Sequence, residues 1–312
     1  MINLSSIDVT NKNLVIRVDM NVPLKNGNIL DATRIEACLP TIDYALKNNA
    51  NILLISHLGR PTEGNFEEKF SLMPVANHLS KIIKKSCELI DTPNSDTIFN
   101  SNCQVQLLEN IRFFHGEKTN SDELGYQLAN LGDVYVFDAF GTAHREQAST
   151  HSAIKQSKVA CAGLLLEKEN NFLGKVLDNY ENPYLAVIGG AKVSTKLELI
   201  KHINNVAENI IVGGGIANTF ICAAGYQVGK SLIEDSMIDF AKEILNEGKI
   251  LLPKKVITSD SFEGSNVKEK SIADIEDHEM ILDLKIENET HTIINSAKTI
   301  LWNGPMGVFE NE

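Results

Sequence analysis

Short runs rich in Val, Ile and Leu alternate along this chain with longer stretches of helical periodicity. Such alternation is typical of βαβ units, in which parallel strands form a sheet and the crossover helices cover its faces. Two series of runs occur. The first predicts strands at 14–19, 51–56, 105–108 and 134–138, and the second at 185–188, 209–212, 255–259, 280–284 and 299–302. The pattern predicts an α/β fold with two doubly wound, Rossmann-like parallel-sheet domains.

The length of the chain and its helical periodicities suggest where these domains divide. A chain of 312 residues exceeds what one hydrophobic core usually supports. Residues 71–85 and 162–179 each place apolar side chains on one face at helical spacing. The second helix lies between the two strand series, where it joins two domains or serves as an ordinary crossover. We expect an N-terminal domain over 1–161, a connecting helix over 162–182 and a C-terminal domain over 183–312.

The composition excludes several classes of protein. Charged residues make up 22% and hydrophobic residues 43% of the chain, and the formal net charge is -12. This describes a folded protein without the general positive charge that nucleic-acid binding needs. No basic leader precedes an apolar run, and no apolar stretch approaches the roughly 20 residues of a membrane helix. The five cysteines have neither metal nor redox spacing. We expect a cytoplasmic protein that binds neither nucleic acid nor membrane and is a monomer.

The arginines are distributed unevenly. The chain has 24 lysines but five arginines, all in its first half: Arg17, Arg34, Arg60, Arg112 and Arg145. Four of them lie just past an expected strand or in the loop that follows, which is where open α/β sheets bind ligands. The guanidinium fork matches carboxylate and phosphate oxygens two at a time. We therefore expect an anionic substrate on the N-terminal half. Structural ion pairing is the alternative, and we favour it for Arg17.

Polar loops follow the four strands of the first series. Their sequences are RVDMNVP at 17–23, SHLGRP at 56–61, ENIRF at 109–113 and DAFGTAHR at 138–145. Asp19 and Asn21 alternate along an extended segment, so they project to the same side and can hold a hydroxyl or carboxylate, or cap the next turn. Four successive strand ends with His or Arg favour a convergent anion pocket over coincidence.

Glycine-rich loops replace arginines in the second series. They are GGAKVSTK at 189–196, GGGIAN at 213–218 and WNGPMGVFE at 302–310. Backbone amides at a strand-to-helix junction attract phosphate. Lys192 and Lys196 stand four residues apart, which predicts one helical face from which both reach a polyphosphate. Neither common nucleotide fingerprint occurs, because Asn218 stands where the dinucleotide pattern needs its last glycine.

Taken together, RVDMNVP, SHLGRP, LLENIRF, DAFGTAHR, GGAKVSTK, GGGIANTF and LWNGPMGVFE resemble the ordered motifs of phosphoglycerate kinase, from Asn13 to Glu310. The resemblance implies reversible transfer of the acyl phosphate of 1,3-bisphosphoglycerate to ADP with Mg²⁺, giving 3-phosphoglycerate and ATP. It implies catalytic roles for Arg34 and Lys192. Substrate binding would fall to Asp19, Met20, Asn21, Arg34, His57, Leu58, Gly59, Arg60, Arg112 and Arg145. Nucleotide binding would fall to Lys196, Gly190, Gly213, Gly214, Gly215, Asn303 and Glu310, and no metal ligand is implied within this chain.

The implied mechanism has a physical basis. A loose phosphoryl-transfer transition state needs in-line placement and cations, with little acid–base work. Arginines that hold the acid on one domain and glycine loops that hold nucleotide on the other meet when the domains close and exclude water.

Two departures from the family pattern limit these expectations. The pattern continues past Glu312 with a Gly-Gly-Gly-Asp motif, so we expect an incomplete second domain and low or no turnover. Lys285 and Ile286 replace a usual Gly-Pro, which changes the turn and is expected to weaken nucleotide binding. The alternatives are a non-catalytic phosphoglycerate-binding protein and a dinucleotide-dependent reductase, whose fingerprint is missing.

Overall fold

The computed structural model describes residues 1–25, 27–94, 96–177, 179–264 and 266–308. The chain divides into two compact units, Met1–Leu173 (unit 1) and Gly174–Glu312 (unit 2). The division falls inside helix α5 (Leu164–Leu177), which lies within the segment expected to connect two domains. Each unit has its own sheet and its own core.

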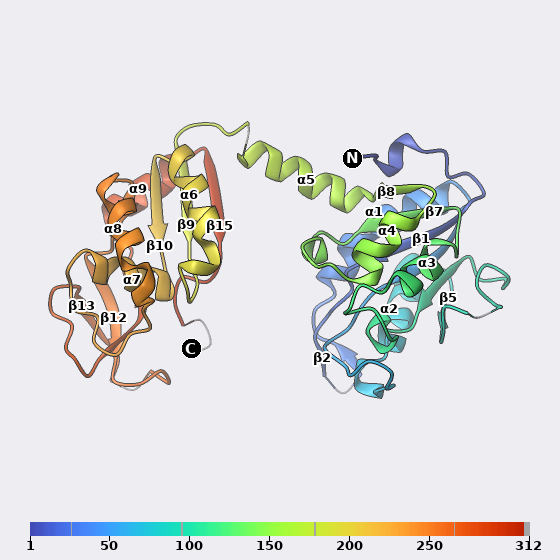
Figure 1. The fold of residues 1–312 in the computed structure, drawn as a ribbon, viewed down its shortest axis with the longest axis horizontal. Helices are drawn as coiled ribbons and strands as arrows, with labels where there is room; N and C mark the ends of the chain where they lie inside the picture. The colour runs from blue at the N-terminus through green and yellow to red at the C-terminus, as the bar shows by residue number, and fades with distance from the viewer. Residues whose placement is uncertain (26, 95, 178, 265, 309–312) are drawn as a thin grey trace. The chain divides into compact units, whose positions relative to one another are not determined.

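Unit 1 contains a six-stranded parallel sheet in the order β5-β6-β4-β1-β7-β8. Figure 1 labels β1, β5, β7 and β8 of this sheet. Its strands are β1 (Asn13–Val18), β4 (Asn51–Ile55), β5 (Cys87–Ile90), β6 (Val105–Leu108), β7 (Val134–Asp138) and β8 (Ala160–Ala162). A small antiparallel hairpin, β2 (Leu24–Lys25) with β3 (Asn28–Ile29), lies outside this sheet. All four strands expected in the first series are present; β5 and β8 were not predicted.

Helices cover both faces of this sheet. They are α1 (Thr33–Lys47), α2 (Met73–Ile83), α3 (Asp122–Ala129) and α4 (Ala153–Gln156). Alternate residues of β1 enter different cores: Leu14 and Ile16 pack with α1 and α2, whereas Val15 packs with α3 and α4. This alternation follows from the period of two in a strand, and it makes unit 1 doubly wound.

The start of helix α5 is attached to unit 1 by side chains from two other elements. The amide of Leu164 donates to Thr41 Oγ1 of α1 at 3.0 Å, and the amide of Leu166 donates to Asp138 Oδ1 of β7 at 2.9 Å. The first amides of a helix have no acceptor within the helix, so these oxygens satisfy them.

Unit 2 contains a four-stranded parallel sheet in the order β11-β10-β9-β15. Its strands are β9 (Tyr184–Ile188), β10 (Asn209–Val212), β11 (Ile250–Leu251) and β15 (Thr299–Asn303). Its helices are α6 (Leu197–Val206), α7 (Gly214–Ala223), α8 (Ile238–Asn246) and α9 (Asn288–Ser296). Side chains of α6, α7 and α8 pack on one face and those of α9 on the other, so the α/β class is confirmed here too.

The expectation that every strand of the second series joins one parallel sheet is wrong. Strands β12 (Lys255–Ser259) and β14 (Met280–Leu284) have the expected bounds but form a separate antiparallel sheet with β13 (Lys268–Ser271). The described residues between β12 and β14 contain β13 and no helix. Parallel strands need a long crossover connection, whereas antiparallel strands accept a short one. Within the described part of the chain, none of the helices combines the length and apolarity of a membrane span.

Candidate active site

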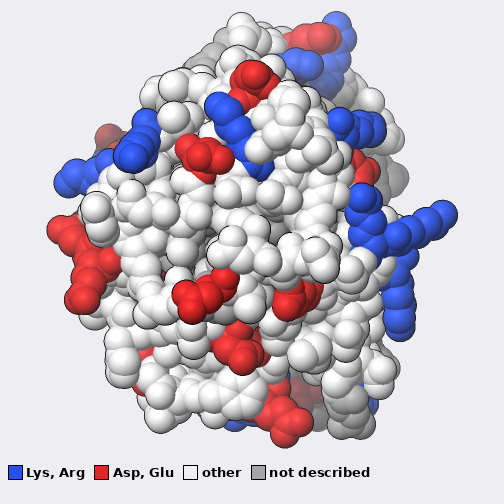
Figure 2. Space-filling view, turned by 90° about the vertical axis from the view of Figure 1, so that its right-hand side faces the viewer, with Lys and Arg blue, Asp and Glu red and all other residues white. Residues whose placement is uncertain are grey.

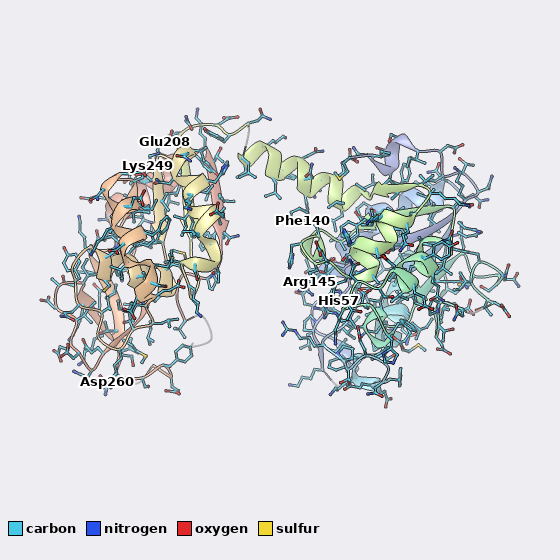
Figure 3. All side chains as sticks on the ribbon, viewed as in Figure 1. His57, Phe140, Arg145, Glu208, Lys249 and Asp260 are labelled. Atoms are coloured by element: carbon cyan, nitrogen blue, oxygen red, sulfur yellow. The ribbon has the colours of Figure 1, made fainter. Side chains whose placement is uncertain are left out.

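Four arginines of unit 1 lie at or just after the carboxyl ends of four neighbouring strands, β6, β4, β1 and β7, and Arg34 of α1 pairs with Asp19 in the loop after β1. We call Arg17, Arg34, Arg60, Arg112 and Arg145 the arginine cluster. The order of strands along the chain reverses at β1, which has β4 on one side and β7 on the other. Open sheets bind ligands in the crevice at such a switch point. His57 and Arg145 lie on the same side of unit 1 (Figure 3), and Arg17, Arg112, Arg145 and Arg34 all lower the pKa of His57.

The loop after β1 holds its neighbours together. Asp19 Oδ2 accepts a hydrogen bond from Arg34 at 2.8 Å, and its Oδ1 accepts from the amide of Asn21 at 3.2 Å. Asn21 Oδ1 accepts from the amide of Gly59 at 2.9 Å. Asp19 and Asn21 therefore orient Arg34 and the loop after β4, in addition to any contact with a ligand. Met20, expected to bind substrate, is fully buried. Its amide donates to Ser56 Oγ at 2.9 Å and its carbonyl accepts from the amide of Val22 at 3.0 Å, so no atom of Met20 is open to a ligand in this structure.

Asn110 holds the loop after β4 in place. Its Nδ2 donates to the carbonyl oxygens of Leu58 at 2.7 Å and Phe70 at 3.0 Å, and its Oδ1 accepts from the amide of Leu58 at 3.2 Å. The next residue, Gly59, has φ of +59°, a conformation that glycine adopts without strain. Asn110 is fully buried, and its two bonds to Leu58 are shielded from water.

Arg112 carries a charge that the described residues do not neutralise through a direct ion pair. The residue is 6% exposed and donates to the carbonyl oxygen of Gly59. Its Nε–H is buried and finds no acceptor among the described residues. Burial lowers the pKa of Arg112, and the neighbouring Arg145 and Arg17 lower it further. A buried guanidinium with a free donor and cationic neighbours favours the binding of an anion.

His57 is a neutral imidazole. The residue is 3% exposed. Burial is the largest cause that lowers its pKa to about 2, and the positive charges of Arg17 and Arg112 come next. A neutral ring can donate one hydrogen bond to a ligand but contributes no positive charge.

Apart from Arg17, which is fully buried, the remaining members of the arginine cluster reach solvent. The Arg34 side chain is 54% exposed while it pairs with Asp19, Arg60 is exposed, and Arg145 is half-buried. Arg145 Nε lies 3.5 Å from His144 Nε2. Acidic and basic side chains are interspersed on the face drawn in Figure 2, so positive charge is not general to the surface. The cluster is a local concentration of donors.

In unit 2, the loops after β9, β10 and β15 pack backbone against backbone. The amide of Gly214 donates to the carbonyl oxygen of Met306 at 2.7 Å. The amide of Gly189 donates to the carbonyl oxygen of Asn303 at 2.9 Å. A Cβ added at Gly189 would lie 1.9 Å from the carbonyl oxygen of Pro305. These loops approach each other this closely because the facing positions have no side chain.

The two candidate lysines lie in different surroundings. Lys196 donates to the carbonyl oxygens of Gly189 at 2.6 Å and Asn303 at 2.9 Å, and burial lowers its pKa. Lys192 is exposed. The expectation that both lie on one helical face is wrong, because a 3-10 turn spans Ser194–Lys196 and helix α6 begins only at Leu197. Lys196 therefore braces the loops after β9 and β15, whereas Lys192 remains exposed beside them.

A cavity of about 390 Å³ opens beside these glycine loops. Its walls include Gly190, Gly214 and Gly215, and apolar side chains such as Leu232, Ile281 and Leu282. Ligand cavities of this size and largely apolar lining suit a flat ring with a few polar contacts. Gly213 lies just outside, at the start of α7.

Asn218, which also lines this cavity, was not predicted to contact a ligand. Its Nδ2 donates to the carbonyl oxygen of Leu232 at 3.2 Å. That bond fixes which end of the amide is the acceptor. Asn218 Oδ1 is buried and has no donor among the described residues, so it can accept from a ligand.

The lining of the cavity does not suit a resident metal ion, because it includes no carboxylate. Among the described residues, Glu276, His278 and Glu279 come close enough to share an ion. However, Lys270 Nζ lies 2.8 Å from Glu279 Oε1, so that carboxylate is already paired. The absence of a metal ligand stays a prediction from the sequence.

Two further expectations concern Glu310 and the segment at Lys285. Glu310, expected to bind nucleotide, lies outside the described residues. Lys285 is the first of the two residues that replace the usual Gly-Pro. Its amide donates to the carbonyl of Lys255 at 3.1 Å, and its Nζ lies 3.3 Å from Glu269 Oε2. Lys285 therefore follows β14 and stays attached to the antiparallel sheet.

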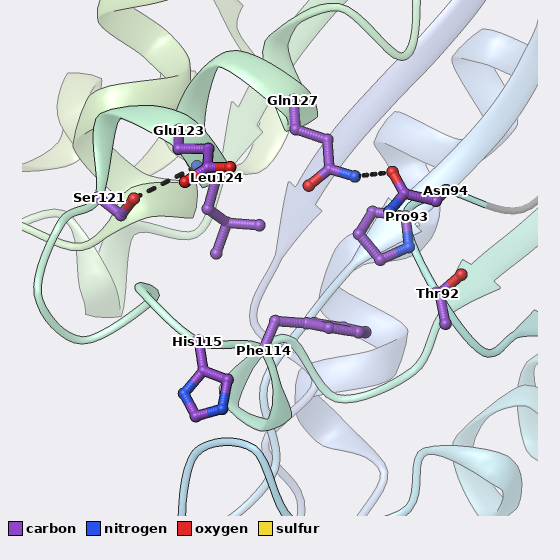
Figure 4. Close-up of a pocket in the computed structure, with 9 residues that line it drawn as sticks. All are labelled: Thr92, Pro93, Asn94, Phe114, His115, Ser121, Glu123, Leu124 and Gln127. Carbon is purple, nitrogen blue, oxygen red and sulfur yellow. Dashed lines mark hydrogen bonds between the residues drawn. The ribbon is translucent and has the colours of Figure 1, made fainter.

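A different cavity of about 370 Å³ lies in unit 1 between the segment after β5 and helix α3 (Figure 4). Phe114 and Leu124 face its interior, and Gln127 donates a hydrogen bond to Asn94 at its rim. No arginine lines it. The candidate anion site is therefore the arginine cluster and not this cavity.

Comparison with known proteins extends over the whole chain. The family model described as phosphoglycerate kinase matches residues 4–312. Phosphoglycerate kinase of Psychrobacter sp. (strain PRwf-1) is 47% identical, over 98% of this chain and 80% of that protein. Phosphoglycerate kinase of Vibrio campbellii (strain ATCC BAA-1116) is 44% identical, over 99% of this chain and 81% of that protein.

Comparison with solved structures also finds phosphoglycerate kinases. The phosphoglycerate kinase of Coxiella burnetii matches with a TM-score of 0.84 and 42% identity, covering 99% of this chain and 81% of that one. The enzyme of Pyrococcus horikoshii OT3 matches with a TM-score of 0.82 and 27% identity, covering 100% of this chain and 82% of that one.

Proposed function

Since this chain belongs to the phosphoglycerate kinase family, we propose that it transfers the acyl phosphate of 1,3-bisphosphoglycerate to ADP, reversibly. A bond between phosphorus and the acyl oxygen breaks, and a bond between phosphorus and a terminal oxygen of ADP forms. In the reverse direction the acceptor is the carboxylate of 3-phosphoglycerate. Neither direction requires proton transfer by the enzyme, which accords with a neutral His57 beside the cations.

The buried Arg112 is the observation that carries this proposal. Its free Nε–H and its positive charge, which forms no direct ion pair among the described residues, favour an anion in the crevice of unit 1. We assign phosphoglycerate to this crevice, with Arg60, Arg112 and Arg145 as donors to its carboxylate and phosphate oxygens. His57, Asn21 and the backbone of the 57–59 loop would fix its orientation. Arg34, which is exposed and oriented by Asp19, would donate to the phosphoryl group in transfer.

We assign the nucleotide to the glycine-walled cavity of unit 2. The adenine ring would lie between the glycine backbone and the apolar side chains, with Asn218 Oδ1 as an acceptor for its amino group. Lys196 and Asn303 would position the loops that face the phosphates, and Lys192 would stabilise the transferring group. Mg²⁺ would arrive with the nucleotide phosphates as part of the substrate, because the cavity lining offers it no carboxylate.

Isothermal titration calorimetry with 3-phosphoglycerate and with ADP plus Mg²⁺ tests these assignments separately. Arg112→Met should weaken 3-phosphoglycerate binding about 100-fold, because charge-assisted hydrogen bonds to a buried anion are lost. Lys81→Met removes one positive charge from an exposed site on α2 and should change the affinity less than about twofold. ADP binding should stay the same in both variants. A wild-type chain that fails to bind 3-phosphoglycerate at millimolar concentration would refute the proposal.

Catalysis needs its own measurement. Formation of ATP from 1,3-bisphosphoglycerate and ADP with Mg²⁺, above the blank rate, assigns the kinase reaction. Binding of 3-phosphoglycerate without ATP formation assigns the alternative, a non-catalytic phosphoglycerate-binding protein.

We also propose that the protein works as a monomer in the cytoplasm. Its five cysteines are free thiols, as in proteins of a reducing compartment. Light scattering coupled to size exclusion should give a mass close to 34.4 kDa. A mass twice that value would contradict the proposed monomer.

A further inference from the structure

A buried carboxylate lies behind the arginine cluster. Glu117 belongs to the segment between the loop after β6 and helix α3, and it is 0% exposed. Burial raises the pKa of Glu117, and the charge of Arg17, the two hydrogen bonds from Ser149 and the charge of Arg112 oppose that rise. Asp19, the other carboxylate of the site, is partly exposed and pairs with Arg34. Glu117 is therefore the buried counter-charge on the core side of the cluster.

Hydrogen bonds connect Glu117 to His57 through two other buried residues. Ser149 donates twice to Glu117, from Oγ to Oε1 at 2.7 Å and from its amide to Oε2 at 2.9 Å. Arg17 Nε donates to Ser149 Oγ at 2.9 Å, and Arg17 NH2 lies 3.3 Å from His57 Nδ1. Arg17 and Ser149 are both 0% exposed. We call these four residues the buried relay.

Further bonds fix the two middle members of the relay. The backbone carbonyl of Ser149 accepts from the hydroxyl of Tyr135 at 2.6 Å. Arg17 NH1 donates to the carbonyl of Val18. Both bonds are buried. The first fixes the backbone of Ser149, and the second means that the Arg17 side chain cannot turn away without leaving a polar atom without a partner.

The direction of every bond in the relay follows from the chemistry of Arg17. A guanidinium has donors and no acceptor. Ser149 Oγ therefore accepts from Arg17 and must point its own hydrogen at Glu117. His57 Nδ1 likewise accepts from Arg17, so the single proton of the neutral ring resides on Nε2.

We propose that Glu117 is a positioning residue, which through Ser149 and Arg17 holds the His57 ring in the Nε2-protonated form for donation to the anionic substrate. The inference rests on the phosphoglycerate site proposed above for the role of that proton. The state of the ring itself is a property of the free protein. Sequence analysis assigns no role to Glu117 or Ser149, because they lie far from each other and from His57 along the chain.

Glu109 provides a matched control. It is also a buried carboxylate of unit 1, 5% exposed, and it also accepts from a serine hydroxyl and a backbone amide. Its bonds run to Ser71 Oγ at 2.7 Å and to the amides of Leu72 at 2.8 Å and Asn110 at 2.7 Å, rather than toward Arg17. Glu109→Gln therefore shows what the loss of a buried carboxylate does to folding when no bond toward Arg17 is involved.

Nitrogen-15 NMR of protein labelled at histidine tests the ring directly. The signals of His57 are identified by their loss in His57→Gln. In the wild-type chain without ligand, we expect Nε2 to carry the proton and Nδ1 to resonate as a hydrogen-bonded acceptor. A proton on Nδ1 in the wild-type spectrum overturns the inference, whether or not any variant folds.

Two variants then test the contribution of Glu117. Glu117→Gln and Ser149→Ala should each move the Nδ1 resonance toward that of an unbonded ring nitrogen. Arg17 loses its buried counter-charge in the first variant and its hydrogen-bond acceptor in the second. Each should also weaken 3-phosphoglycerate binding about 10-fold. Glu109→Gln should leave both His57 resonances unchanged. Folded Glu117→Gln and Ser149→Ala proteins with a wild-type His57 spectrum would contradict the inference.

These measurements separate the two proposals. A wild-type protein with the expected His57 spectrum that binds no 3-phosphoglycerate would refute the proposed function and leave the relay in place. A protein that binds 3-phosphoglycerate but has its proton on Nδ1 would refute the relay and leave the proposed function in place.

Discussion

Unit 1 builds its candidate site from side chains, whereas unit 2 builds its site from main chain. The arginine cluster lies at the ends of four strands and is held by buried polar residues such as Asn110 and Ser149. In unit 2, the loops after β9, β10 and β15 hydrogen-bond to one another through backbone groups at glycine positions. A site of side chains depends on further polar residues that orient it. A site of main chain depends on the absence of side chains where loops touch.

The largest expected effect is a loss of nucleotide binding at the main-chain site of unit 2. Gly189→Ala places a methyl group 1.9 Å from the carbonyl oxygen of Pro305, so the loops after β9 and β15 must separate. ADP binding, measured by calorimetry, should weaken at least about 100-fold, because the wall of the cavity loses its geometry. Binding of 3-phosphoglycerate should not change.

Gly174→Ala is the control for that prediction. Nothing lies within 4 Å of a Cβ added at Gly174, which is inside helix α5. Alanine favours a helix over glycine by about 1 kcal/mol, so this variant should be at least as stable as wild type and bind both ligands normally. If Gly189→Ala behaves like Gly174→Ala, the proposed closeness of the loops is wrong.

The second effect is a loss of stability in unit 1, where buried polar side chains hold the site. Asn110→Ala removes the partners of buried backbone groups in the loop after β4. The free energy of unfolding should fall by about 2 to 3 kcal/mol in urea melts, because buried polar groups lose their bonds.

The control for this variant is Asn130→Ala. Asn130 also donates to a carbonyl oxygen, but it is exposed at the end of α3. Its replacement should cost less than about 0.5 kcal/mol. Equal losses in the two variants would show that the network around Asn110 adds nothing to stability.

The smallest expected effect is a dependence of folding stability on pH. It arises in unit 1, from His57. Burial, followed by the charges of Arg17 and Arg112, lowers the pKa of this residue from 6.5 to about 2. Between those values the unfolded chain binds a proton that the folded chain does not, so stability falls as pH is lowered below 6.5. At most about 2 kcal/mol should be lost between pH 6.5 and pH 5.

Urea melts at several pH values measure this loss. His57→Gln should show a shallower decline than wild type over the same interval, since glutamine does not titrate. Identical slopes in the two proteins would contradict a neutral, buried His57.

The sequence predicted most of the sheet strands but not their partners. Short apolar runs such as 105–108 and 134–138 have the bounds of β6 and β7, because period and composition report local burial. The same signal at 255–259 and 280–284 does not state whether neighbours run parallel or antiparallel. Strand β13 consists of Lys268, Glu269, Lys270 and Ser271, and nothing apolar marks it. Pairing is decided by contacts far along the chain.

The candidate site shows the same division. Arg60, Arg112 and Arg145 could be predicted because a guanidinium past a strand has a chemical meaning in isolation. Asn110, Glu117 and Ser149 could not, because each matters only through a partner that the fold brings beside it. Asn218 is similar, since its acceptor matters only beside the cavity. In unit 1, the arginines proposed to touch a ligand are readable from the sequence, and the residues that hold them are not.

The pairing of β15 with β9 has a consequence for the nascent chain. Synthesis runs from the N-terminus, and domains generally fold as units in that order. Every member of the arginine cluster has left the ribosome once Arg145 has emerged, and the sheet beneath it is complete at β8 (Ala160–Ala162). The loop after β9 must wait for β15 (Thr299–Asn303), which is made more than a hundred residues later. On the ribosome, the anion site is therefore finished well before the nucleotide site exists.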